Sequence, residues 1–109
     1  MTRRVNLFRW EDLPLEKVTE MIARKVVESA HTTLTQAYLK KGALVPRHAY
    51  PSDMTIYVLQ GALRARVEGE ADVTVRENEA LVIAAGALYE TESLDDTFVI
   101  TVMGRSILA

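Results

Sequence analysis

The chain has 109 residues, of which 49% are apolar and 26% are charged, and its formal net charge is −2 at pH 7. A chain of this length builds one domain around one hydrophobic core. Charges of both signs are interleaved and leave no basic surface for nucleic acid or for a membrane, so we expect neither partner. The sequence contains no cysteine, which excludes disulfides, thiolate zinc sites and cysteine nucleophiles. No stretch has the length of a signal peptide's apolar region or of a membrane span, so we expect a cytoplasmic protein.

The beginning of the chain has the least regular pattern. Residues 5–10 alternate in part between apolar and polar side chains, which predicts a short strand. Pro14 then turns the chain. Residues 15–25 also carry apolar side chains at helical spacing, but we favour a loop or a single turn up to Thr19. A strand is expected to follow over residues 21–28.

The rest of the chain is a series of short strands separated by Gly, Pro, Asp and Asn at intervals of about ten residues. The strands are expected at residues 32–40, 43–49, 54–59, 62–67, 71–76, 80–84, 88–91 and 97–103. Alternation is strict over 62–67, and Gly69 follows it where a hairpin turn needs a positive φ. The wholly apolar run at 80–84 predicts a strand that is buried on both faces. This pattern is typical of an all-β sandwich or barrel.

One stretch resembles the first sequence motif of the cupin family. That motif contains a Gly, two His, a Glu or Gln and a closing Gly at fixed spacing. Its places are taken here by Gly42, His48, Tyr50, Met54 and Gly61. Of the three metal-ligand places in this motif, only the first keeps its usual residue, because Tyr50 and Met54 stand at the other two.

A second stretch resembles the second cupin motif, in which Gly, Pro, Gly, His and Asn follow one another at fixed spacing. Its places are taken by Asn78, Ala84, Gly86, Tyr89 and Ser93. The likeness covers residues 8–103, and the flanking stretches are similar to the small cupins grouped with the pectin-degradation protein, which linearises unsaturated uronates. Tyr89 stands where the last metal-ligand His of a cupin would be.

The resemblance implies the fold, the domain organisation and the oligomeric state. The fold would be all-β, a cupin double-stranded β-helix, or jelly-roll barrel, of two antiparallel sheets. One cupin domain would cover residues 1–109, with N-terminal strands and a loop at 1–28, the barrel at 29–104 and a tail at 105–109. Cupins commonly pair through their N-terminal strands, so a homodimer is the expected partner arrangement.

The replaced ligand places bear on the cofactor. One imidazole with two phenols and a thioether is a poor ligand set for divalent iron, manganese, nickel or zinc. We therefore expect no metal cofactor, with His48 the only ligand-type residue kept at the cupin positions. Asp53 lies beside a ligand place, but we interpret it as a solvated turn carboxylate.

The same positions define a candidate pocket for an organic ligand. The candidate pocket residues are His48, Tyr50, Met54, Tyr89, Gln36 and Tyr38. Gln36 and Tyr38 have the parity to face the barrel interior if their strand contains no bulge. The tyrosines supply rings with polar hydroxyl groups that suit a ligand in the mouth of a barrel. An equal alternative is that their rings fill the space that a metal ion occupies in other cupins. Met54 is interpreted as a core filler.

His48 is the best candidate for a catalytic residue, as a general base, or for a donor to a bound anion. The alternative is a half-buried histidine that is hydrogen-bonded to Tyr50 or Tyr89. Arg64 and Arg66 share one face of their strand and could bind a carboxylate, but a solvated face is the default. Several apolar residues are assigned to the core or to a sheet-to-sheet dimer contact. They are Leu63, Val67, Val73, Val75, Leu81, Ile83, Phe98, Ile100 and Val102.

Three functions remain open. The first is a metal-free cupin that binds a small ligand, such as a sugar acid or another carboxylate, as a sensor or accessory protein. The second is an isomerase or lyase acting on a sugar acid, in which His48 acts with or without a metal and Tyr50 or Tyr89 is the proton partner. The third is a structural, dimeric module without a ligand. The replaced ligand places favour a protein that is not an enzyme.

Overall fold

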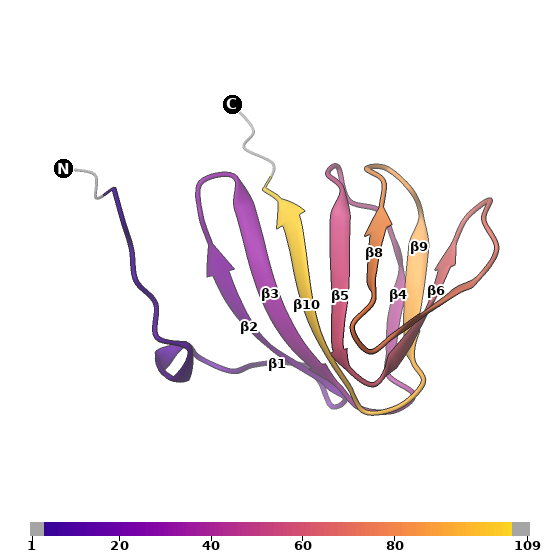
Figure 1. Cartoon of the computed structure of the whole chain (residues 1–109), viewed down its shortest axis with the longest axis horizontal. Helices are drawn as coiled ribbons and strands as arrows, with labels where there is room; N and C mark the ends of the chain where they lie inside the picture. The colour runs from indigo at the N-terminus through magenta and orange to yellow at the C-terminus, as the bar shows by residue number, and fades with distance from the viewer. Residues whose placement is uncertain (1–3, 106–109) are drawn as a thin grey trace.

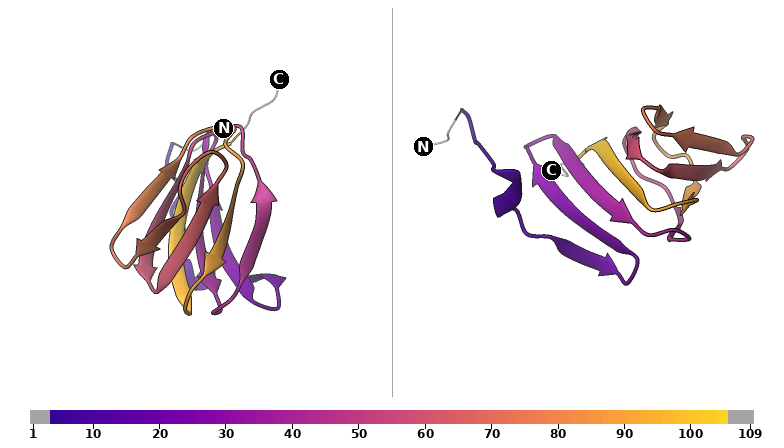
Figure 2. Two further views of the ribbon diagram at one scale, coloured as in Figure 1. Left: turned by 90° about the vertical axis from the view of Figure 1, so that its right-hand side faces the viewer. Right: turned by 60° about the horizontal axis from the view of Figure 1, so that its bottom comes forward.

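The computed structural model describes residues 4–105, which form two antiparallel sheets and one short 3-10 helix (Figures 1 and 2). The helix is η1 (Trp10–Asp12), and the strands are β1 (Glu16–Thr19), β2 (Ile22–Glu28), β3 (Thr32–Leu39), β4 (Leu44–His48), β5 (Met54–Gln60), β6 (Ala62–Val67), β7 (Val73–Arg76), β8 (Ala80–Ile83), β9 (Tyr89–Ser93) and β10 (Thr97–Gly104). The six-stranded sheet has the order β1-β2-β3-β10-β5-β8, and the four-stranded sheet has the order β4-β9-β6-β7. The predicted all-β fold of two antiparallel sheets is confirmed.

The hydrophobic core fills the space between the two sheets. In strand β5 buried side chains alternate with half-buried ones, so one face of the strand contributes to the core. Val58, near its centre, is fully buried. From the four-stranded sheet, Leu63 and Val75 face β5 and are also buried. Of the apolar residues assigned to the core or a dimer contact, Leu63, Val75 and Ile83 are core, and Val67 and Leu81 pack against it.

The most regular part of the sequence folds as its alternation predicts. Strand β6 covers residues 62–67 as expected, and it pairs with β7 across a turn in which Gly69 has a φ of +83°. Leu63 and Ala65 face inward, whereas Arg64 and Arg66 lie on the outer face. Strands β2, β3, β4, β5, β7, β8, β9 and β10 also fall where they were predicted, with ends that differ by one or two residues.

The predictions for the start of the chain are wrong in two places. Residues 5–9 form no strand, and Val5 and Leu7 are 81% and 89% exposed. No described strand lies beside this segment, which extends away from the sheets in Figure 1. Residues 16–19 are a strand rather than a loop, because a tight turn folds β1 back onto β2. In that turn the amide of Met21 donates a hydrogen bond to Oγ1 of Thr19 at 3.0 Å.

The prediction that residues 80–84 are buried on both faces is also wrong. Strand β8 lies at the edge of the six-stranded sheet, where only the inner face is covered. Ile83 is 4% exposed, whereas Val82, on the outer face, is 63% exposed. The apolar outer face of this sheet continues across β10, where Val102 is also exposed.

Two further features concern the ends of the chain. Strands β1 and β2, expected as N-terminal additions to the barrel, belong to its six-stranded sheet. Of the predicted tail at 105–109, only Arg105 lies among the described residues, and it forms an ion pair with Glu28 at 3.1 Å. No helix within residues 4–105 has the length and apolar character needed to cross a membrane.

Candidate functional site

A cavity of about 290 Å³ lies between the inner faces of the two sheets. Strands β1, β2, β3, β5 and β10 form one wall, and β4, β6 and β9 form the other. The wall is mainly apolar, with Met54, Ile56, Leu63 and Val99 among its residues. Polar side chains in the lining come from both sheets, with Thr35 and Thr101 from one and His48 and Tyr89 from the other.

A cluster of three rings, formed by His48, Tyr50 and Tyr89, lies at the cavity wall. The antiparallel ladder of β4 and β9 places His48 directly opposite Tyr89, with their ring centroids 4.5 Å apart. Tyr50 follows two residues later and meets the histidine ring edge-on, with a centroid distance of 4.8 Å. Its backbone is fixed by a 2.8 Å hydrogen bond from the amide of Gly86 to the carbonyl of Tyr50.

The hydrogen bond of His48 defines which ring nitrogen is available. Nδ1 lies 2.6 Å from the carbonyl oxygen of Pro46. A carbonyl oxygen can only accept, so Nδ1 must carry the proton that it donates. This leaves Nε2 of His48 as the free position on the ring. The expected alternative, a hydrogen bond from His48 to Tyr50 or Tyr89, is not what the described residues show, because these rings pack against the histidine instead.

Tyr89 is held as a neutral phenol. Its side chain belongs to the buried core, and burial, with a smaller contribution from Tyr50, raises the pKa of Tyr89 to about 12. Among the described residues, neither tyrosine hydroxyl has a hydrogen-bond partner, so both tips remain available to a ligand. Met54 is 6% exposed and serves both as a core residue and as part of the cavity wall.

The structure places two of the predicted pocket residues elsewhere. Gln36 and Tyr38 were expected to face the cavity, but they point to the outer side of the six-stranded sheet. The ring of Tyr38 packs edge-on against Phe98 at 4.4 Å. Gln36 lies opposite Lys25, whose ammonium group donates to the carbonyl of Trp10 at 2.8 Å. The prediction that these two side chains face the cavity is therefore wrong, because the alternation along β3 is shifted by one residue.

The residues that do face the cavity from β3 are Thr35, Ala37 and Leu39. Thr91, two residues after Tyr89, and Thr101 on β10 add hydroxyl groups that the sequence analysis did not identify. For Thr91 a signal existed, since residues two apart on a strand share a face. Arg24 on β2 also lines the cavity, and its charge makes it unusual there.

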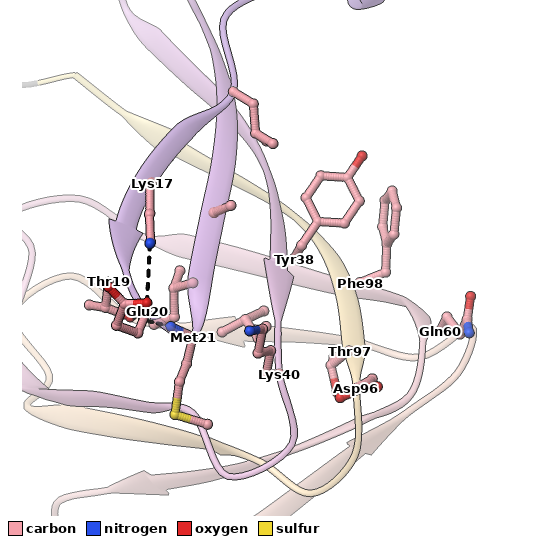
Figure 3. A pocket seen from close by; sticks show the side chains of 14 residues that line it. Lys17, Thr19, Glu20, Met21, Tyr38, Lys40, Gln60, Asp96, Thr97 and Phe98 are labelled. Atoms are coloured by element: carbon pink, nitrogen blue, oxygen red, sulfur yellow. Dashed lines mark hydrogen bonds and ion pairs between the residues drawn. The ribbon is translucent and has the colours of Figure 1, made fainter.

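A second concavity, of about 520 Å³, lies beside the β1–β2 turn (Figure 3). It is lined by outward-facing side chains such as Tyr38 and Phe98, together with Lys17, Lys40 and Asp96. In Figure 3 the rings of Tyr38 and Phe98 lie side by side, and a dashed line joins Lys17 to Glu20. Lys17 and Glu20 thus pair with each other in this outer groove.

The described residues contain no group of three or more His, Cys, Asp or Glu side chains placed to hold a metal ion. Asp53, considered beside the first motif, uses its Oδ1 atom to accept a hydrogen bond from the amide of Ala85 at 2.9 Å. Its carboxylate therefore caps a turn, as the sequence analysis predicted.

The two facing sheets, with the site between them, define a small jelly roll of the cupin type. Solved structures support this: the chain is similar to KdgF from a Halomonas species, with a TM-score of 0.83 and 22% identity over 94% of this chain and 96% of that one. An RmlC-like cupin from Shewanella frigidimarina gives a TM-score of 0.84 at 14% identity, covering 97% and 96% of the two chains.

A variant of oxalate decarboxylase from Bacillus subtilis is also similar, with a TM-score of 0.83 and 15% identity over all of this chain but 32% of that one. No protein-family model and no curated protein sequence matches the chain. At these identities the likeness establishes the fold, and the predicted cupin fold is confirmed.

Proposed function

We propose that the chain is a metal-free cupin that binds a small organic molecule, in a sensor or accessory role. The observation that carries the proposal is the ring cluster of His48, Tyr50 and Tyr89 at the wall of a mainly apolar cavity. Nδ1 of His48 is bonded to the carbonyl of Pro46, which leaves Nε2 and the two phenol hydroxyls to bind a ligand. Small-molecule sites combine an apolar lining with a few convergent polar groups in this way. The cavity, at about 290 Å³, lies at the small end of such sites and suits a ligand of monosaccharide size.

The ligand class that we propose is a sugar acid or another carboxylate. One support is the similarity of fold to KdgF, a pectin-degradation protein. Another is the chemistry of the wall, where hydroxyl groups of Thr91 and Thr101 could bind sugar hydroxyls. Neutral phenols and a histidine complete a set of donors suited to oxygen-rich ligands.

The absence of a metal is part of the proposal and rests on the ligand chemistry at the cupin positions. His48 is the only imidazole at these positions, and it supplies one ligand nitrogen, Nε2. A phenolate at Tyr89 is disfavoured at neutral pH, because burial raises its pKa to about 12. The thioether of Met54 suits soft Cu(I) rather than a hard divalent ion. These residues do not fit the divalent metal site of a cupin.

A thermal-shift screen with sugar acids, including D-galacturonate, tests the proposal. A ligand at 100 times its Kd stabilises the native state by about 2.7 kcal/mol, which raises the Tm of a chain of this size by about 10 °C. We expect such a shift with at least one acid. His48→Ala should reduce it, whereas Tyr57→Phe, at a surface hydroxyl bonded to Asn78, should not. A screen with no shift for any acid would contradict the proposal.

The second candidate is an isomerase or lyase that acts on a sugar acid. It is favoured by the free Nε2 of His48, which could move a proton, with the neutral phenol of Tyr50 or Tyr89 as its partner. Turnover of an unsaturated uronate, lost in His48→Ala, would support this function over simple binding. A structural module without a ligand is the remaining alternative, and it predicts neither binding nor turnover.

We also propose that the chain forms a homodimer. Its support is the apolar surface that the described residues leave uncovered, including Val5, Leu7 and Phe8 in the extended N-terminal segment and Val82 and Val102 on the outer sheet face. Exposed apolar surface of this kind marks interaction sites. A cytoplasmic location remains a prediction.

A further inference from the structure

The wall of the inner cavity carries one positive charge and no negative one among the described residues. Within residues 4–105, Arg24 is the only side chain with a permanent charge on this wall, and no Asp or Glu lines it. Arg24 lies on β2 opposite Ala37, which also lines the cavity, so the two residues share the inner face of the sheet.

The guanidinium of Arg24 is only weakly engaged. Its one partner among the described residues is the carboxylate of Glu16 on β1, with Nη2 and Oε2 3.4 Å apart. Both side chains are about half exposed, at 45% and 48%. A charge-assisted hydrogen bond of full strength is shorter than this, and a guanidinium has five N–H donors. Most of the N–H donors of Arg24 therefore have no protein partner among the described residues.

We propose that Arg24 binds the carboxylate of the ligand at the mouth of the cavity, and that Glu16 is the protein carboxylate that the ligand displaces. The inference rests on the proposed function, because it assigns the charged group of the ligand that the cavity binds. Arginine is suited to this role, since its planar fork binds both carboxylate oxygens. The uncharged part of the ligand then lies along the apolar wall toward the ring cluster.

Arg64 and Arg66, which the sequence analysis considered as a carboxylate site, do not line the cavity. Arg66 lies on the outer face of the four-stranded sheet and is neutralised there by Glu92 at 2.8 Å and by Asp72 at 3.7 Å. Arg64 shares that outer face. It therefore provides a matched control, because Arg64→Gln removes the same charge from the protein without changing the cavity.

The test is isothermal titration calorimetry with D-galacturonate and with D-galactose, its uncharged counterpart. We expect the acid to bind more tightly than the neutral sugar. Arg24→Gln should weaken acid binding by about tenfold, as loss of a charged hydrogen-bonding partner does, and should leave D-galactose unaffected. Arg64→Gln should leave both unchanged. Glu16→Gln should tighten acid binding by about two- to fivefold, because the competing carboxylate is gone.

The outcomes separate this inference from the function on which it rests. If both sugars bind equally, or if Arg24→Gln binds the acid as the unmodified protein does, the role of Arg24 is refuted while the cavity remains a binding site. If neither sugar binds the unmodified protein, the proposed function fails for uronates and this inference fails with it. Arg24→Gln and Glu16→Gln change side chains that are about half exposed. The melting temperatures of these two variants show directly whether the fold is intact.

Discussion

Titration of Tyr89 tests the electrostatic reasoning about the site. The pKa of this phenol is raised to about 12 by burial, whereas in the unfolded chain it should be near the ordinary value of about 10. Between these two values the unfolded chain has lost the proton that the native chain still holds. The stability contributed by neutral Tyr89 is therefore fully present below about pH 10 and is lost as the pH rises through about 12.

The size of the effect follows from the shift. Two pKa units correspond to about 2.7 kcal/mol in total, and about half of that should be lost by pH 11. The assay is urea unfolding at about pH 9 and about pH 11 for the unmodified chain, for Tyr89→Phe and for Tyr57→Phe. The loss between the two pH values should be smaller in Tyr89→Phe by about 1.4 kcal/mol. Tyr57→Phe should behave as the unmodified chain does, because its hydroxyl lies at the surface.

Equal losses in all three proteins would refute the reasoning. So would an ultraviolet titration in which Tyr89 ionises together with the exposed tyrosines. Either result would mean that the phenol is less protected than its 3% exposure indicates. The argument against a tyrosinate ligand to a metal would then lose its main support.

Three further predictions concern the fold, the positions that correspond to cupin metal ligands, and assembly. Gly61→Ala should lower the free energy of unfolding in urea by about 2–4 kcal/mol, because φ of Gly61 is +89° and the new Cβ would lie 2.5 Å from a backbone oxygen. At Gly69 the new Cβ would meet no atom within 4 Å. Gly69→Ala should therefore lower the free energy of unfolding by less than half as much. The triple variant Tyr50→His, Met54→Glu, Tyr89→His should bind Mn²⁺ or Zn²⁺ in equilibrium dialysis, whereas the unmodified chain should not. Light scattering at micromolar concentration should give the mass of a dimer, and a monomer would contradict the proposed pairing.

The parts of the fold that the sequence predicts well are those in which local and global requirements coincide. In residues 62–67 one face is buried and the other is solvated, so alternation identifies both the strand and its inner side chains. Gly69 then fixes the turn, since positive φ is costly for other residues. The proximity of His48 and Tyr89 could likewise be inferred, because motif spacing encodes the pairing of two strands that are distant in the chain.

The segments predicted wrongly depend on partners that a local pattern does not contain. Residues 5–9 have a strand-like pattern, but a strand requires a neighbour for its hydrogen bonds, and none of the described strands lies beside this segment. Residues 16–19 are mostly polar and exposed, yet they form a strand because a tight turn brings them alongside β2. In both cases the backbone pairing, rather than side-chain periodicity, decides the structure.

The orientation of β3 shows why the inner residues of a site are harder to predict than its strands. Thr35 and Ala37 face the cavity, and Gln36 and Tyr38 face outward, but both sets mix apolar and polar side chains. Alternation assigns faces only when one of them is clearly polar, and the outer face of this sheet is apolar as well. The same uncovered outer face that obscured the parity of β3 is the surface proposed for pairing. The faces of β3 were thus predicted wrongly because the outer face of the six-stranded sheet is apolar and is not covered by other described residues.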